Sequence, residues 1–322
     1  MTYPLGDIPV RNDLQTIAFY NVENLFDVFD DQRTNDNDFL STSVKKWTKK
    51  RYGNKLRKLG YTISNIGKKE TGKHPALIGI AEVESANAIE DLIASAHLND
   101  CSYKYIHYDS LDERGIDVAL LYDATVFQVL DSEIFRVDLL NEANLPDYTR
   151  DILLVSGLLD GEKIHVIVNH WSSRREGEKE TEFKRLASSN KVGELISKIK
   201  HNDAQAKIVV VGDFNDDPSS LSIKQLVDAH GLFNPMETLR SYSRGSSNYN
   251  RQWNLFDQIL FSTNFFESTK TDFEYFTADI FDANFLKLMN GKYKGTPFRT
   301  YIGKRYNGGY SDHFPVYAIF KK

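Results

Sequence analysis

The chain has 322 residues, of which 41% are hydrophobic and 26% are charged, a composition typical of globular proteins that excludes disordered and fibrous classes. Its formal net charge of −5 argues against a protein that coats nucleic acid through a broadly basic face. The charge does not exclude a nuclease, because a cluster of carboxylates that holds a metal ion is itself acidic.

Two further features concern the compartment. No apolar run is long enough to cross a bilayer, and the N-terminus, residues 1–10, lacks the basic start and apolar segment of a signal peptide. The single cysteine, Cys101, excludes an internal disulfide framework and fits a reducing compartment. We therefore expect a cytoplasmic protein without a transmembrane segment, or a periplasmic or secreted one if a signal peptide has been removed.

Runs of β-branched and aromatic residues recur along the chain and predict strands. In chain order these cover residues 16–20, 77–81, 104–108, 118–122, 153–159, 164–169, 208–211, 255–261 and 316–320. Apolar residues at helical spacing predict helices at 56–66 and 183–199, and a third helix is expected at 88–96. The apolar face of the second helix would consist of Phe183, Leu186, Val192, Leu195, Ile196 and Ile199.

Polar segments separate these elements. The segments at 27–42, 171–180, 240–254 and 291–310 predict long loops, which in a compact domain are usually functional or disordered. The densest basic stretch, at 45–58, is interpreted as a solvated helix face, with contact to a phosphate as the alternative.

The number of strands relative to helices indicates the fold class. Many strands with few long helices favour sheets that pack on one another and are covered by helices, an α/β or α+β sandwich, over strict β-α-β alternation. No linker and no internal repeat interrupts the pattern. We therefore expect one domain over residues 1–322.

Polar side chains stand at the ends of four apolar strand-like runs. In chain order they are Asn21 and Glu23, Glu82, Asn169 and His170, and Asp213 and Asn215. Taken singly, such residues are more often turn formers or helix caps. Strand ends on one side of a sheet would gather them, which is a common way to build a metal and acid–base site.

An acidic residue also lies inside an apolar run. Asp257 belongs to the predicted strand at 255–261, and a carboxylate in a half-buried strand needs a partner. A histidine is an obvious one, and Ser311-Asp312-His313 precedes the last predicted strand.

These motifs resemble those of the endonuclease/exonuclease/phosphatase family, which includes pancreatic deoxyribonuclease, apurinic endonucleases, deadenylases, sphingomyelinases and inositol-polyphosphate 5-phosphatases. The matching segments occur in the family's order and span essentially the whole chain: Tyr20-Asn21-Val22-Glu23, the Glu82 segment, Asn169-His170, Gly212-Asp213-Phe214-Asn215, Asp257 and Ser311-Asp312-His313. The chain looks most like a Bacteroidetes-type branch. The resemblance implies a four-layer sandwich of two packed β-sheets flanked by helices.

The resemblance also implies a metal site. Glu82 would be the principal Mg²⁺ ligand, supported by Asn21, Glu23 and Asp312, with Mn²⁺ as an alternative ion. An oxygen-rich set of this kind suits a hard cation. Glu84 remains a rival ligand, because many relatives have a glutamine before the glutamate where this chain has Ala81.

Catalytic roles follow from the same resemblance. Asp213 would orient or deprotonate the attacking water, and Asn215 would fix its position. His313, held by Asp257, would stabilise charge on the phosphoryl oxygens. His170 would donate a hydrogen bond or a proton toward the leaving oxygen.

His170 should need a carboxylate partner of its own. Asp117 is the candidate, because an acidic residue at the head of the corresponding strand supports this histidine in deoxyribonuclease-like relatives. The alternative is that Asp117 is a surface residue at the start of a strand.

Substrate contacts are expected from the loops around these motifs. Arginines there could bind phosphate oxygens, and aromatic side chains could stack on bases. The alternative for each aromatic residue is that it packs a loop onto the body. The candidates are Arg114, Asn169, Arg174, Arg175, Trp253, Arg299 and Tyr301.

Three functional hypotheses remain. The first is a Mg²⁺-dependent phosphoesterase that hydrolyses phosphodiester bonds as an endonuclease or exonuclease. The second is a phosphatase or lipid-headgroup phosphodiesterase, although the chain lacks the tryptophan and the Cys-Asp-Arg segment of the inositol-phosphatase branch. The third, a catalytically inactive binding module, is disfavoured by the complete motif set. The expected partner is nucleic acid or another phosphodiester, and no protein partner is evident.

Overall fold

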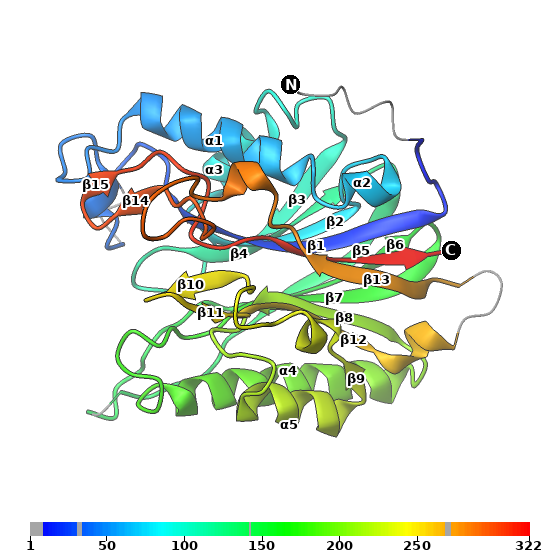
Figure 1. Cartoon of the computed structure of the whole chain (residues 1–322). Coiled ribbons are helices and arrows are strands. Elements are labelled where there is room, and N and C mark those ends of the chain that lie inside the picture. The colour runs from blue at the N-terminus through cyan, green and yellow to red at the C-terminus, as the bar shows by residue number, and fades with distance from the viewer. Residues whose placement is uncertain (1–8, 31–33, 142, 268–271) are drawn as a thin grey trace.

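Two six-stranded sheets pack face to face in the computed structural model, which describes residues 9–30, 34–141, 143–267 and 272–322 (Figure 1). The first sheet has the order β13 (Glu274–Ile280), β16 (Val316–Lys321), β1 (Leu14–Leu25), β2 (Leu77–Val83), β4 (Asp117–Asp123) and β3 (Tyr103–His107). The second has the order β5 (Phe127–Phe135), β6 (Ile152–Leu159), β7 (Glu162–His170), β8 (Lys207–Asp213), β12 (Asp257–Ser262) and β9 (Leu232–Phe233). Most of the N-terminal segment expected to lack a signal peptide lies outside the described residues.

Helices cover the outer face of each sheet (Figure 1). The first sheet carries α1 (Lys49–Ile63), α2 (Lys68–Thr71) and α3 (Ala86–Ile93), and the second carries α4 (Glu182–Asn202) and α5 (Leu221–His230). The expected four-layer α/β sandwich is therefore confirmed. No helix in the described part of the chain is both long and apolar enough to span a membrane.

Strand β1 shows how alternation in the sequence builds these layers. Ile17 and Phe19 point into the core between the sheets, whereas Ala18 and Tyr20 belong to the cluster under the helices. Because successive strand side chains point to opposite faces, one apolar run supplies both cores. Each buried side chain as large as Ile17 or Phe19 contributes about 1.5 to 3 kcal/mol.

Shorter elements occupy the loops. Two of the expected loops contain hairpins, formed by β10 (Ser247–Tyr249) with β11 (Gln252–Asn254) and by β14 (Tyr301–Ile302) with β15 (Arg305–Tyr306). Four 3₁₀ helices cover Asn37–Phe39, Pro235–Thr238, Thr263–Phe266 and Asn284–Leu286. Strands β5 and β13 were not predicted, because both lie at sheet edges and mix exposed with buried positions, which weakens the apolar signal.

The predicted apolar face of α4 is partly wrong. Phe183 is 52% exposed, whereas Arg185, Ser188 and Ser189 are buried. These buried side chains have polar partners: Arg185 Nη1 donates to Thr181 Oγ1 at 2.6 Å and Nε lies 2.8 Å from Asp216 Oδ1, and Ser189 Oγ donates to the Ser222 carbonyl of α5 at 2.7 Å. Hydrogen bonds offset the free-energy cost of burying these polar groups. A pattern based on apolar residues alone therefore did not identify them as buried.

The topology brings the polar motifs to one rim of the sandwich. Strands β1 and β2 are parallel, as are β7 and β8, so each pair ends at the same edge. Strand β12 runs antiparallel to β8 and begins with Asp257 opposite Asp213. Strand β16 is antiparallel to β1, which delivers the Asp312-His313 segment to the same rim.

Candidate active site

Asp213 lies at the centre of the site. Its side chain is 2% exposed, and it stands 3.9 Å from His313 Nδ1 and 3.8 Å from His170 Nε2 through the same oxygen, Oδ2. Asn21 Nδ2 donates to that oxygen at 3.0 Å, and the backbone amide of Asn215 donates to Oδ1 at 3.0 Å. Burial raises the pKa of Asp213 to about 6, although His313 opposes the shift.

His313 and Asp257 form the closest pair in the site. His313 Nδ1 lies 2.6 Å from Asp257 Oδ2, and Asp257 is completely buried. Burial by itself would lower the pKa of His313, but the carboxylates of Asp257 and Asp213 outweigh it and hold that pKa well above its usual value. The imidazole is therefore kept protonated, with Nε2 left over to act as a donor.

His170 has the opposite electrostatic setting. Burial lowers the pKa of His170 well below its usual value, and the positive charges of Arg150 and Arg114 lower it further. Its Nδ1 is buried and has no hydrogen-bond partner in the described part of the chain. The site thus shifts the pKa values of the two histidines beside Asp213 in opposite directions.

The expected pair between His170 and Asp117 is not formed. Asp117 Oδ2 lies 3.4 Å from His107 Nε2, and Oδ1 accepts the Ser110 amide at 3.1 Å. Asp117 starts β4 in the first sheet, beside β3, which carries His107. The histidine that faces Asp117 is therefore His107, which the neighbouring strand of the same sheet supplies.

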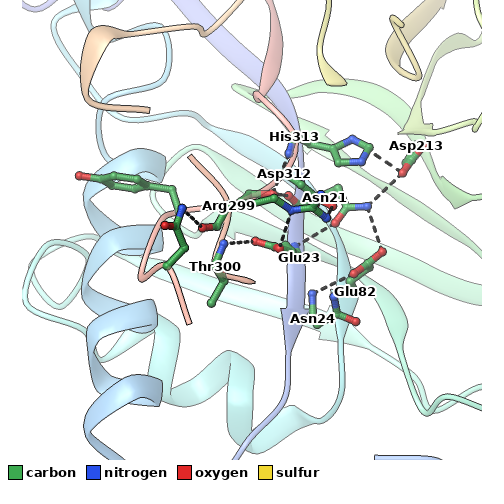
Figure 2. Close-up of polar contacts among 12 residues, drawn as sticks. Asn21, Glu23, Asn24, Glu82, Asp213, Arg299, Thr300, Asp312 and His313 are labelled. Carbon is green, nitrogen blue, oxygen red and sulfur yellow. Dashed lines mark hydrogen bonds and ion pairs between the residues drawn. The ribbon is translucent and has the colours of Figure 1, made fainter. Parts of the chain in front are cut away.

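Three carboxylates lie beside this group: Glu23 near the end of β1, Glu82 near the end of β2, and Asp312 in the loop before β16 (Figure 2). Glu82 accepts a hydrogen bond from the backbone amide of Asn24 at 2.8 Å and one from Asn21 Nδ2 at 3.3 Å. Glu23 accepts the Thr300 amide at 2.6 Å. The third carboxylate, Asp312, accepts Arg299 Nη2 at 2.7 Å, and Arg299 Nε lies 3.6 Å from Glu23 Oε1.

Unusual backbone conformations aim these carboxylates. Glu23, Asn24 and Glu82 all have positive φ, at 52°, 53° and 66°, a region that non-glycine residues seldom adopt. The pairing of β1 with β2 shifts register between Asn21 and Leu25. Such irregularities re-aim side chains at strand ends, and they cluster at functional sites.

The carboxylates of Glu82, Glu23 and Asp312 are chemically suited to a hard divalent cation, but they do not form a group whose ligand atoms all lie within 4.8 Å of one another. Glu82, Glu23 and Asp312 offer carboxylate oxygens, the ligands that Mg²⁺ and Mn²⁺ prefer. Asn21 differs from expectation, because its Oδ1 accepts the Glu23 amide at 2.9 Å and its Nδ2 faces carboxylates. The rival Glu84 is held by the Asp27 amide at 2.6 Å.

Sequence reasoning missed Lys55, which lies beneath the carboxylates. Its side chain is 1% exposed, donates to Thr300 Oγ1 at 2.6 Å, and places Nζ 3.8 Å from Glu23 Oε2. Burial lowers the pKa of Lys55 to about 8, and burial also raises the pKa of Glu23 to about 6. The available signal was its spacing, because Lys55 stands four residues before Leu59 on the buried face of α1. The solvated-face interpretation of the basic stretch is therefore wrong at this residue.

Arg150 was also missed. Its side chain is 9% exposed, with Nη1 3.1 Å from Asp112 Oδ2 and Nη2 donating to the Trp171 carbonyl at 2.8 Å. The same carbonyl accepts Asn215 Nδ2 at 3.0 Å. Arg150 thus holds the segment that follows His170 and, through the shared carbonyl, the side chain of Asn215.

Arg150→Met should raise the pKa of His170, because it removes a positive charge that disfavours the imidazolium. It should also lower kcat by about tenfold, since a small displacement of positioning groups slows a reaction that depends on orientation. NMR titration of His170 and kcat on a chromogenic diester check both effects. Arg136→Met, at a half-exposed ion pair with Asp151, is the control, and an unchanged His170 pKa would contradict this role.

The candidate substrate contacts divide into three groups. Asn169 is completely buried and its Oδ1 accepts a hydrogen bond from Trp171 Nε1 at 3.2 Å, and its role as a substrate contact stays a prediction. Two others are engaged with the protein: Arg174 donates to the Asn215 carbonyl and to Asp216, and Trp253 stacks on Phe314. The remaining four lie at the rim or line a cavity beside it: Arg114, Arg175, Arg299 and Tyr301.

The four-layer sandwich with histidines and carboxylates at one rim defines a phosphoesterase type of fold. The chain belongs to the Endonuclease/Exonuclease/phosphatase family, which it matches over residues 16–322. Members of that family are hydrolases that act on phosphoester bonds. No curated protein matches the chain by sequence.

Solved structures share the fold at low sequence identity. A mannosyl-6-phosphatase of Bacteroides thetaiotaomicron superposes with a TM-score of 0.57 at 17% identity, covering 96% of this chain and 100% of that one. TDP2 of D. rerio, complexed with single strand DNA product, gives 0.56 at 16% identity, covering 97% and 100%. The catalytic domain of human Nocturnin, with bound sulfate anion, gives 0.57 at 15% identity, covering 97% and 96%.

Proposed function

We propose that the chain is a divalent-metal-dependent phosphodiesterase that acts on nucleic acid. The observation that carries the proposal is the position of Asp213 Oδ2, which lies 3.8 Å from His170 Nε2 and 3.9 Å from His313 Nδ1. A buried carboxylate with a pKa of about 6 is suited to a general base near neutral pH. A neutral and a protonated histidine beside it can serve different oxygens of one phosphate.

Glu82, Glu23 and Asp312 would hold the metal ion, with Mg²⁺ as the first candidate and Mn²⁺ as the second. When bound, such an ion offsets negative charge on the phosphoryl oxygens. Unlike these three carboxylates, Asp213, Asp257 and His313 bring ligand atoms within 4.8 Å of one another. Because His313 Nδ1 is already engaged by Asp257, we assign this second group to proton chemistry.

The protein's own residues divide the remaining work. Asp213 accepts a proton from the attacking water, and Asn215, fixed through the Trp171 carbonyl, orients that water. The imidazolium of His313 donates from Nε2 to a phosphoryl oxygen, and Asp257 holds the ring in position. Neutral His170 donates a hydrogen bond toward the leaving oxygen.

Glu82→Gln should weaken Mg²⁺ binding at least tenfold while the fold is retained, because it removes the charge but keeps one oxygen. Isothermal titration calorimetry gives the affinity, and the melting temperature reports the fold. Glu84→Gln is the matched control, since Glu84 is held by the Asp27 amide. If Glu82→Gln kept the affinity of the wild type, another residue would be the principal ligand.

The substrate class is tested by comparing a chromogenic phosphodiester with the corresponding monoester, each with Mg²⁺, with Mn²⁺ and with EDTA. The proposal expects turnover of the diester that depends on metal, together with cleavage of DNA or RNA. Preference for the monoester would favour a phosphatase, the activity of the similarly folded mannosyl-6-phosphatase. Absence of turnover on all substrates would favour a binding module.

A further inference from the structure

A cavity of about 180 Å³ lies beside the carboxylate group and shares Glu23 and Arg299 with it. Its lining comes from segments that are far apart in the sequence. The full lining is Glu23, Asn24, Phe39, Lys45, Arg175, Arg299, Thr300, Tyr301 and Gly303. The loop that follows β7 of the second sheet thus meets loops of the first sheet here.

The charge of the lining points to an anionic ligand. Three of its side chains are cations, Lys45, Arg175 and Arg299, and one is an acid, Glu23. Glu23 is already compensated, because Lys55 Nζ lies 3.8 Å from it and Arg299 Nε lies 3.6 Å from it. Arg299 is itself paired with Asp312 at 2.7 Å, so the excess positive charge of the cavity comes from Arg175 and Lys45.

Arg175 is free to take a ligand, whereas Lys45 is held by an exposed ion pair and by the Phe39 ring, whose centroid lies 3.9 Å from Nζ. Arg175 is exposed and has no hydrogen bond or ion pair with the described residues. Lys45 pairs with Asp38 at 3.3 Å, but the Asp38 side chain is 71% exposed, and exposed pairs contribute only about 0 to 1 kcal/mol. Arginine and lysine are the side chains that bind phosphate oxygens best.

The size of the cavity limits the ligand to a small group. Sites for whole drug-sized ligands enclose about 300 to 1,000 Å³, more than this cavity of about 180 Å³ offers. Its aromatic residues add no stacking platform, because Phe39 and Tyr301 are each 7% exposed and pack against other rings. A single phosphate fits this combination of size and charge.

We propose that this cavity binds a second phosphate of the substrate while the first is at the catalytic group. This inference rests on the proposed phosphodiesterase function and narrows it to substrates with two phosphate groups. The second phosphate can be a terminal monoester or the next linkage of a nucleic acid chain. Arg175 and Lys45 are the binding residues that this assigns.

The test compares three chromogenic substrates with the same leaving group. They are thymidine 3′-(p-nitrophenyl phosphate), the same compound with a 5′-phosphate, and the same compound with a 5′-phosphodiester to a second thymidine. We expect the compounds with a second phosphate to have a KM about tenfold lower than the first. A lower KM for the 5′-phosphate compound alone would show that the cavity binds a terminal phosphate monoester. A lower KM for both compounds with a second phosphate would show that it binds a phosphate of the nucleic acid chain.

The variants Arg175→Ala and Lys45→Ala should each reduce this KM ratio toward 1. Lys179→Ala, at an exposed residue in the same loop as Arg175, should keep the ratio of the wild type. Turnover of all three substrates with equal KM would overturn the cavity proposal and leave the phosphodiesterase intact. Absence of turnover on all three would overturn the proposed function as well. A KM ratio unaffected by Arg175→Ala and Lys45→Ala would also overturn the assignment.

Discussion

Asp213→Asn is expected to lower kcat on a phosphodiester by roughly a hundredfold or more, the scale of a lost acid–base contribution. The substitution keeps the size of the side chain and an oxygen for the Asn215 amide, but it removes the negative charge and the base. Asp213 now accepts hydrogen bonds from Asn21 Nδ2 and from the Asn215 backbone amide, and the new side-chain amide nitrogen would face one of these two donors. Measurements of kcat, KM and melting temperature on the same preparation separate catalysis from stability.

Asp217→Asn is the matched control for this experiment. Asp217 is buried in the same segment and accepts the Leu255 amide at 2.8 Å, but it contacts neither histidine of the site. We expect its kcat to stay within about twofold of the wild type, because the catalytic group is untouched. An Asp213→Asn protein with unchanged kcat would remove Asp213 from the mechanism.

Lys55→Met is expected to cost about 3 to 5 kcal/mol of stability, because it removes a buried partner of Glu23 and leaves that carboxylate only partly compensated by Arg299, 3.6 Å away. The cost should grow as pH rises. Burial already raises the pKa of Glu23 to about 6, and Lys55 opposes that rise. Without Lys55 the pKa of Glu23 in the folded state rises further above its value in the unfolded state. The free energy of unfolding then falls as pH rises, because the unfolded state accommodates the ionised carboxylate more easily than the folded state does.

Urea unfolding at about pH 5 and about pH 8 measures both the loss and its pH dependence. Lys50→Met is the control, since Lys50 is exposed on the same helix, and a surface substitution of this kind changes stability by no more than about 0.5 kcal/mol. Equal stability of the two variants, or a Lys55→Met cost independent of pH, would show that Lys55 does not compensate Glu23.

Much of the fold was predictable because its signals are local. Strands such as β1 and β8 contain runs of β-branched and aromatic residues whose alternate side chains enter different cores, and these runs identified them. The edge strands β5 and β13 lack that pattern because one of their sides is solvated. The buried residues Ser188 and Ser189 of α4 were missed because hydrogen bonds, rather than apolar character, allow their burial.

The sequence by itself determined which chemical groups this protein carries at its strand ends, and in what order. Asn21, Glu82, His170 and Asp213 could be identified as candidates because polar residues directly after apolar strands stand out along the chain. Their convergence on one rim follows from strand direction, which the parallel pairs β1–β2 and β7–β8 supply.

Only the tertiary structure decided which group each of these residues faces. Asp117 faces His107 rather than His170, Lys55 lies beneath Glu23, and Arg150 joins Asp112 to the Trp171 carbonyl. These contacts join elements through strand register and loop packing, which no local pattern encodes. Burial and neighbouring charges together then shift the two imidazoles in opposite directions: burial and the nearby arginines lower the pKa of His170, whereas the carboxylates of Asp257 and Asp213 outweigh burial and raise the pKa of His313.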